Sequence, residues 1–353
     1  MTDFFIRVKQ QQEQQLPFVI YSKPGEKQLV GIFQKNDHLY FAEDFTEVGF
    51  VMAPFDGDRI ILFPEPFSEV HTAAMVFANG TKPSRLTGNT DSDAGKKFED
   101  MVQSAIDAIE KGFFSKVVLS RKESVAVPEF DVVPVFEQMV NGYPSAMTYC
   151  WYHPKIGMWI GATPERLLKA NANKFYSVAL AGTQKFEGTT DVHWPSKEKD
   201  EQHFVTEFIL DNLRTIASEV VVSSPYTVQA GNLLHIKTDI EGILNENSTL
   251  REVVSVLHPT PAVCGLPKIT AKDFILRNEG YNREYYTGYL GELNKDFATD
   301  DRETDLYVNL RCMQIRDGAA IIYSGCGITK DSVPEKEFIE TVNKSMTMKK
   351  LIL

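Results

Sequence analysis

Four short apolar runs follow one another in the middle of the chain: MTYCWYHP (147–154), GMWIGATP (157–164), ERLLKA (165–170) and KFYSVALAG (174–182). Each run has the length of a strand and is rich in aromatic or aliphatic residues. Pro, Gly and Asn stand in the breaks between them, where the chain is expected to turn. This stretch therefore predicts a series of strands.

Similar runs occur on both sides of this stretch. Residues 17–63 contain PFVIYS, QLVGIF, HLYFA and RIILF, whose alternation is typical of antiparallel strands. Helices are predicted over residues 93–111, 196–217 and 331–345. Because no Pro/Gly/Ser-rich linker divides the chain, we expect one α+β domain (α/β by some schemes) with large sheets bracketed by helices. Residues 1–94 would form a strand-rich part of that domain and residues 95–353 the remainder.

Length, charge and cysteine content exclude several classes of function. The 353 residues are 43% hydrophobic and 24% charged, as in a globular protein with a large core. A net charge of −11 argues against nucleic-acid and anionic-membrane partners. The four cysteines lack metal-ligand spacing, the N-terminus is polar, and no apolar run approaches roughly 18–20 residues. We therefore expect a cytoplasmic protein with reduced thiols.

The stretch DSVPEKEFIETVNKS (331–345) collects three glutamates before a lysine. Asp331 and Ser332 are expected to start a helix, which then places Glu337, Glu340 and Lys344 on one face. A solvated face with a Glu340–Lys344 pair is one interpretation. The other is a carboxylate pair that holds a hard cation.

A second glutamate pair has the same spacing. Glu198 and Glu201 lie three residues apart in SKEKDEQHF (196–204), at the start of another predicted helix. One such pair is unremarkable on a solvated helix. Two helices that each present a pair could hold Mg²⁺, which prefers oxygen ligands and often bridges to an anionic substrate.

Two charged residues mark the ends of predicted strands. Lys116 begins the apolar strand in FFSKVVLSRK (113–122), and Glu165 follows an apolar strand in WIGATPERLL (159–168), where a turn or helix start is expected. The structural alternatives are a solvent-facing lysine and an acid in the first turn of a helix. The functional alternatives are a partly desolvated lysine that acts as a general base and a pocket carboxyl that acts as a general acid.

Small residues follow two other predicted strands. SVALAGTQ (177–184) runs into Gly182 and Thr183, where backbone amides can approach a ligand closely. In YSGCGITKDS (323–332) the strand is expected to end in a Gly-Cys-Gly turn whose N–H groups form an anion-binding nest. An ordinary strand end and a plain glycine-rich turn are the alternatives. Arg311, which ends DLYVNLR, can clamp a carboxylate with two nitrogens. Together these groups describe a pocket for a small dicarboxylate held through Mg²⁺.

Several blocks in this order resemble the chorismate-utilising enzymes, a family that includes isochorismate synthase, salicylate synthase and the large chains of anthranilate and aminodeoxychorismate synthases. The blocks are KVVLSR, GATPERLL, ALAGT, SKExxE, LLHIKTDIEGIL, LHPTPAVCGLPK, REYYTGYLGEL, LYVNLRCMQI and SGCGITKDSVPEKEFIETVNK. The resemblance covers residues 95–353 strongly and implies that this region binds chorismate.

Three positions imply the isochorismate synthase branch of the family. Lys116 matches the water-activating lysine, which the ammonia-using members lack. LHPTPAVCG (257–265) resembles the isochorismate synthase form of that block, and the Arg-Asn-Asp of the anthranilate type is absent after Glu201. The implied reaction is the reversible, Mg²⁺-dependent conversion of chorismate to isochorismate, by water attack at C2 with loss of the C4 hydroxyl.

The resemblance also implies roles for individual residues. Lys116 would activate the water and Glu165 would protonate the departing hydroxyl. Glu201 and Glu340 are the implied Mg²⁺ ligands, with Glu198 and Glu337 beside the metal or bound to it through water. The implied substrate-binding residues are Gly182, Thr183, His235, Tyr286, Arg311, Gly325, Cys326, Gly327 and Lys344. A packed strand histidine is the structural alternative for His235.

Two other functions stay open at this point. Salicylate synthase would form isochorismate and then eliminate pyruvate, and a non-catalytic homologue would bind chorismate without turnover. Either a menaquinone or a siderophore pathway is compatible with the sequence. We expect a monomer or a weak dimer whose partner is a small molecule.

Overall fold

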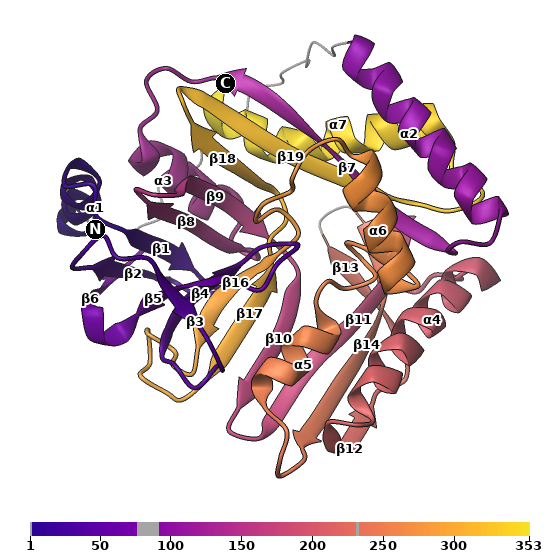
Figure 1. The fold of residues 1–353 in the computed structure, drawn as a ribbon, viewed down its shortest axis with the longest axis horizontal. Coiled ribbons are helices and arrows are strands. Elements are labelled where there is room, and N and C mark those ends of the chain that lie inside the picture. The colour runs from indigo at the N-terminus through magenta and orange to yellow at the C-terminus, as the bar shows by residue number, and fades with distance from the viewer. Residues whose placement is uncertain (1, 76–91, 231–232) are drawn as a thin grey trace.

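Two large antiparallel sheets form the body of the computed structural model, which describes residues 2–75, 92–230 and 233–353 (Figure 1). Helices cover the outer faces of both sheets, and a layer of large side chains fills the space between the sheets. This mixed arrangement confirms the predicted α+β class.

The first sheet contains nine strands among the described residues. Their spatial order begins with a two-residue strand beside the strand that carries Lys116. In that order the strands are β15 (Gly265–Leu266), β7 (Lys116–Ala126), β19 (Ala319–Ile328), β18 (Cys312–Arg316), β9 (Gly157–Thr163), β8 (Met147–His153), β1 (Phe18–Ser22), β2 (Gln28–Gln34) and β6 (Ser68–Ala74).

The second sheet contains ten strands among the described residues. Nine of them follow one another in a single spatial order, the main path, and the tenth, β13 (Tyr226–Ala230), pairs with β14 outside that order. The strands of that path are β12 (Ala217–Val222), β14 (Leu233–Leu244), β11 (Lys174–Lys185), β10 (Arg166–Asn171), β17 (Thr304–Val308), β16 (Tyr289–Leu293), β4 (Gly49–Ala53), β5 (Ile60–Pro64) and β3 (Tyr40–Ala42). Strands from the first 94 residues therefore enter both sheets.

Seven α-helices occur in the described residues, with one short 3₁₀ helix at Glu65–Phe67. Figure 1 shows α4 and α5 against the second sheet and α2, α3 and α7 around the first sheet. The helices are α1 (Thr2–Glu13), α2 (Ser92–Glu110), α3 (Val132–Gly142), α4 (Ser196–Leu213), α5 (Leu250–Leu257), α6 (Lys268–Asn278) and α7 (Pro334–Ile352). Within the described ranges, every helix is too short or too polar to span a lipid bilayer.

The alternation of side chains explains why so many strands are apolar throughout. In β1, Val19 and Tyr21 face the layer between the sheets, whereas Phe18 and Ile20 face the helices outside the first sheet. Successive side chains of a strand point to opposite faces. Where both faces of a sheet are covered, as at β1, both sets of positions must be apolar.

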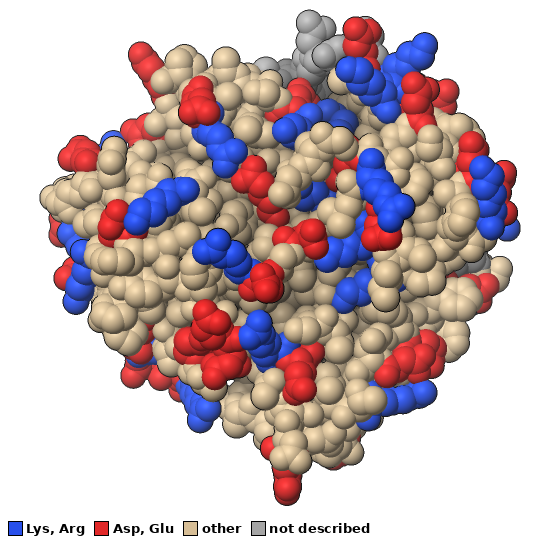
Figure 2. All heavy atoms as spheres, in the orientation of Figure 1, with Lys and Arg blue, Asp and Glu red and all other residues tan. Residues whose placement is uncertain are grey.

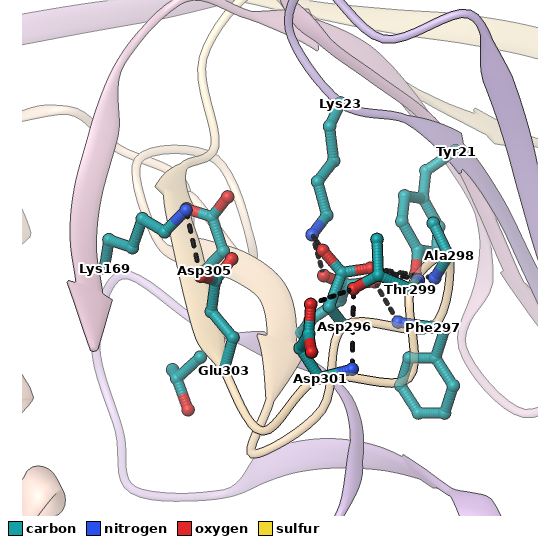
Figure 3. Close-up of polar contacts among 12 residues, drawn as sticks. Tyr21, Lys23, Lys169, Asp296, Phe297, Ala298, Thr299, Asp301, Glu303 and Asp305 are labelled. Atoms are coloured by element: carbon teal, nitrogen blue, oxygen red, sulfur yellow. Dashed lines mark hydrogen bonds and ion pairs between the residues drawn. The ribbon is translucent and has the colours of Figure 1, made fainter. Parts of the chain in front are cut away.

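A polar cluster joins the two sheets at the edge of this apolar layer. Lys23, just after β1, lies 2.6 Å from Asp296 in the loop after β16. Figure 3 shows the two side chains pointing toward each other. The Lys23 ammonium also pairs with Glu292 of β16, which accepts a hydrogen bond from Tyr21. Glu292 is only 1% exposed, and this desolvation raises its pKa to about 7 although Lys23 pulls the pKa down. The cluster therefore depends on the lysine to neutralise a buried acid.

Acidic and basic side chains are interspersed over the face of the molecule drawn in Figure 2. The chain has 48 acidic and 37 basic residues, so its net charge of −11 is a small excess of acidic over basic side chains. An anionic ligand would therefore have to be bound by a local field built from a few groups.

We predict that Lys23→Met destabilises the fold by about 3–5 kcal/mol, because it leaves Glu292 buried without its cation. The folded pKa of Glu292 lies above its ordinary value, so the folded state favours the protonated acid and loses stability as the pH rises through about 7. The loss in Lys23→Met should therefore be larger at about pH 8.5 than at about pH 5.5, as measured by urea unfolding.

The control is Lys9→Met, which removes a 3.0 Å pair with Asp131 whose side chains are about half exposed. Exposed pairs contribute about 1 kcal/mol or less, so this variant should unfold nearly like the wild type at both pH values. An equal loss of stability at the two pH values for Lys23→Met would show that Glu292 does not need the lysine.

Candidate active site

The predicted site residues meet where the chain passes from one sheet to the other. β9 of the first sheet leads into β10 of the second through Pro164 and Glu165 alone. β17 of the second sheet leads back to β18 of the first through residues 309–311. The sequence predicted a turn or a helix start at this point. The helix start is wrong, because β10 begins at the residue after Glu165 and the Glu165 carbonyl accepts a backbone hydrogen bond from Val308.

The environment of Glu165 favours its protonated form. The residue keeps partial exposure, but desolvation of the carboxyl raises its pKa to about 7, while the Lys116 charge and the Thr260 hydroxyl lower it. This is the direction that a general acid near neutral pH requires. Thr260 was not among the predicted site residues, although it lies in LHPTPAVCG, a block that the resemblance had already singled out.

Lys116 approaches the same place from β7. Its Nζ lies 2.6 Å from Oε1 of Glu201, and the two side chains are 15% and 30% exposed. Glu201 belongs to α4, which packs on the second sheet, so this ion pair connects the two halves of the fold. A Cβ atom at Gly327 would lie 3.1 Å from Cε of Lys116, so the glycine leaves room for the lysine chain.

The Gly325–Gly327 segment continues strand β19, and the predicted turn with an anion nest is wrong. Gly325 lies opposite Ser120 of β7, and Gly327 opposite Val118. The N–H groups of Ser120 and Val118 bond on the side away from β19. Two opposite residues in an antiparallel pair either hydrogen-bond to each other or both turn their N–H groups away from the partner strand. Since Ser120 and Val118 turn theirs away, the N–H groups of both glycines point away from β7.

The outward side of these glycines is open to the site. β18 pairs with residues 319–322 of β19 only. The chain enters β18 from Arg311, so no part of β18 lies beside Gly325 and Gly327. The Gly325 carbonyl accepts a 3.0 Å hydrogen bond from Nζ of Lys344. A strand edge therefore presents backbone N–H groups where the sequence predicted a turn.

Helix α7 brings its glutamates beside this edge. It begins at Pro334 with Val333 as its N-cap, so the expected start at Asp331-Ser332 is slightly too early. Glu340 Oε1 lies 2.6 Å from Nζ of Lys344, as the spacing predicted. Burial raises the pKa of Glu337, and the nearby negative charge of Glu340 raises it further.

Arg311 and Tyr286 complete this side of the site. Arg311 has a φ of 47°, which turns the chain out of the sheet. Burial lowers the pKa of Arg311, while the negative charge of Glu340 opposes that shift. Tyr286 is 3% exposed and stacks on Tyr323 at 5.4 Å between ring centroids. Its hydroxyl would lie 3.0 Å from a Cβ atom at Gly325.

The remaining predicted residues lie on the second sheet. Gly182 has a φ of 69° at a bulge in β11, and a Cβ there would lie 3.1 Å from that of Glu198. A ring nitrogen of His235 lies 3.0 Å from the Gly182 carbonyl, and burial and the charge of Lys344 lower the histidine pKa. The side chain of Thr183 lies outside the described residues.

The four glutamates have the chemistry of a magnesium site. No three His, Cys, Asp or Glu side chains of the described chain lie together as a preformed metal-binding group. However, Oε2 of Glu198 is buried without a hydrogen-bond partner, and Glu201 and Glu340 each contact an ammonium group. Carboxylate oxygens that are unpaired or held by lysines can accept a hard cation.

The arrangement thus combines a proton donor, a lysine, carboxylates and anion-binding groups around one place. Glu165 and Lys116 supply groups for acid–base chemistry, and Arg311 with the edge of β19 supplies groups for carboxylates. The site takes residues from both sheets and from α4 and α7.

Known proteins provide an independent comparison. The family model of chorismate binding enzymes matches residues 69–353. The chain is 27% identical over 284 residues to a salicylate biosynthesis isochorismate synthase of Pseudomonas aeruginosa, covering 77% of this chain and 58% of that protein. It is 29% identical over 263 residues to isochorismate synthase EntC of Escherichia coli K12, covering 71% and 66%. The chain therefore matches about three fifths of the length of these relatives.

Relatives with another activity also match. Anthranilate synthase component 1 of Aeropyrum pernix is 29% identical over 293 residues, covering 75% of this chain and 62% of that protein. The chain is therefore similar to relatives with two different activities.

Solved structures have the same fold. A putative 2,3-dihydroxybenzoate-specific isochorismate synthase, DhbC, from Bacillus anthracis superposes with a TM-score of 0.75 at 22% identity, covering 97% of this chain and 98% of that chain. The menaquinone-specific isochorismate synthase MenF from Escherichia coli gives 0.78 at 20% identity, covering 96% and 89%. Because the family match includes every element that carries Lys116, Glu165 and the two glutamate pairs, the chain belongs to the family of chorismate binding enzymes.

Proposed function

We propose that this protein is an isochorismate synthase, which interconverts chorismate and isochorismate with Mg²⁺. The observation that carries the proposal is the approach of Glu165, with a pKa of about 7, to the charge of Lys116. A base and an acid at one site are what the exchange of a ring hydroxyl requires. The similarity to relatives named isochorismate synthases supports the same reaction.

The proposed chemistry moves a hydroxyl between two ring carbons. Glu165 carries its proton near neutral pH and delivers it to the C4 hydroxyl, which leaves as water. A second water attacks C2 and gives its proton to Lys116. One C–O bond forms at C2, one breaks at C4 and both ring double bonds shift, so substrate and product have the same composition.

Lys116 must be free of its extra proton before it can act as a base. Its Nζ lies in a 2.6 Å ion pair with Glu201, and that pair must be released in the active complex. Bound Mg²⁺, held by Glu201 and Glu340 with Glu198 and Glu337 beside them, would neutralise these carboxylates and fix the ring carboxylate. Lys344 would then balance the remaining negative charge.

The second carboxylate of chorismate needs its own partners. We assign it to Arg311 and Tyr286, with the outward N–H groups of Gly325 and Gly327 as further donors. Gly182 and Thr183 would line the ring. His235, whose lowered pKa keeps it neutral, can offer a hydrogen bond without adding charge.

Incubation of the purified protein with chorismate and Mg²⁺, followed by chromatography, tests the function. We expect isochorismate and no pyruvate. Lys116→Ala should lower turnover by roughly 10²–10⁴-fold with little change in chorismate affinity, because the lysine makes the nucleophile. Lys122→Ala, which alters an exposed lysine on the same strand, should retain turnover.

Three results would contradict these assignments. No conversion by the wild type would refute the function, and release of pyruvate, detected with lactate dehydrogenase, would indicate salicylate synthase. A loss below about tenfold in Lys116→Ala would refute its role as the base.

We predict that Glu340→Gln and Glu201→Gln weaken Mg²⁺ binding, measured by calorimetry, and that excess Mg²⁺ partly restores turnover. Glu335→Gln is the matched control, since Glu335 is exposed and lies off the face shared by Glu337, Glu340 and Lys344. Equal weakening in all three variants would contradict the assignment of the metal to this face.

A further inference from the structure

A fully buried ion pair lies behind the site, between Glu279, just after α6, and Arg283. Both side chains are 1% exposed. Nε of Arg283 donates to Oε2 of Glu279 at 2.8 Å, and Nη2 donates to Oε1. Removing one partner of such a pair would leave an uncompensated charge in the protein interior.

The guanidinium uses all five of its N–H donors. Besides the two bonds to Glu279, Nη1 donates to the Val263 carbonyl at 3.0 Å and to the Thr287 hydroxyl at 3.1 Å. Nη2 donates to the Val118 carbonyl at 2.7 Å. These donors lie in one rigid plane, so the bonds fix the directions of their acceptors.

The carboxylate of Glu279 reaches the same strand as the guanidinium. Its Oε1 accepts hydrogen bonds from the backbone N–H of Ser120 at 2.7 Å and from the Ser120 hydroxyl at 2.9 Å. The guanidinium also stacks at 4.4 Å from the ring centroid of Phe55 and 5.9 Å from that of Tyr286. The pair is therefore packed as well as hydrogen-bonded.

The acceptors belong to three segments that are far apart in sequence and that each carry a site residue. Val118 lies two residues after Lys116 on β7. Val263 lies in the same block as Thr260, whose hydroxyl lowers the pKa of Glu165. Thr287 is the neighbour of Tyr286. The ion pair thus connects the three segments that carry Lys116, Thr260 and Tyr286.

Apolar side chains of similar volume can replace many buried ion pairs without loss of stability. Apolar side chains pack without fixed direction, however. The ion pair instead makes five directional hydrogen bonds to the three segments, three donated by Arg283 and two accepted by Glu279 from Ser120. We propose that Arg283 and Glu279 are positioning residues, which hold Lys116, Thr260 and Tyr286 in register for the reaction. Their effect on turnover rests on the proposed function, while their effect on the three segments does not.

Arg283→Lys tests the proposal, because an ammonium keeps the charge but has only three donors without the planar fork. A displacement of about 1 Å at a reacting group can cost roughly 10²-fold in rate, so kcat should fall on that scale, and KM should rise only as far as Tyr286 is displaced. Val140→Ala in α3 is the control, since it opens a cavity in the core on the far face of the first sheet. It should lower the melting temperature without lowering kcat.

Amide hydrogen exchange supplies a readout that needs no activity. In Arg283→Lys, exchange should rise together in residues 116–120, 260–264 and 285–288, and in Val140→Ala it should rise around α3 instead. If Arg283→Lys fails to fold, Ser120→Ala, which removes one bond to Glu279, should show the same pattern more weakly on β7.

Exchange that rises evenly over the chain, or a kcat no lower than that of Val140→Ala, would overturn the proposal. If the wild type does not convert chorismate, the proposed function fails, and the exchange pattern alone decides whether the pair positions the three segments.

Discussion

The site depends on one constraint, that the chain must leave one covered sheet and enter the other. Much of each sheet is apolar on both faces, and the polar groups of the site gather at two places where the chain changes sheet. Glu165 lies at the crossing from β9 to β10, and Arg311 lies at the crossing from β17 to β18. The second crossing also ends the pairing of β18 with β19, which leaves the backbone of Gly325 and Gly327 facing the site. Acid, anion-binding arginine and strand edge therefore share one topological cause.

Desolvation at these crossings sets the protonation state of the acid. It raises the pKa of Glu165 to about 7, against the opposing charge of Lys116. The glutamates of α4 and α7 are neutralised differently, by the ammonium groups of Lys116 and Lys344. In the proposed reaction, Mg²⁺ held by Glu201 and Glu340 would neutralise these carboxylates in place of the two lysines.

Periodicity predicted the strands, the glutamate faces of both helices and the Glu340–Lys344 pair, because these depend on neighbours within one element. Periodicity failed where contacts with distant parts of the chain determine the local structure. Thr163-Pro164-Glu165 has the composition of a helix start, yet it links two strands of different sheets. The Gly-Cys-Gly sequence suggested a turn, but Gly327 leaves space for the side chain of Lys116. Thr260 and Arg283 gave no local signal, since their partners lie far away in sequence.

The most direct test of the account measures forward and reverse turnover of Glu165→Gln at equal enzyme and saturating substrate. In the forward direction Glu165 must donate a proton, and in the reverse direction it must accept one from water, so a glutamine cannot do either. The account predicts comparable losses in both directions, roughly 10²–10⁴-fold, with Mg²⁺ binding intact. A loss confined to the forward reaction would contradict it, because Glu165 would then not exchange a proton with the C4 oxygen.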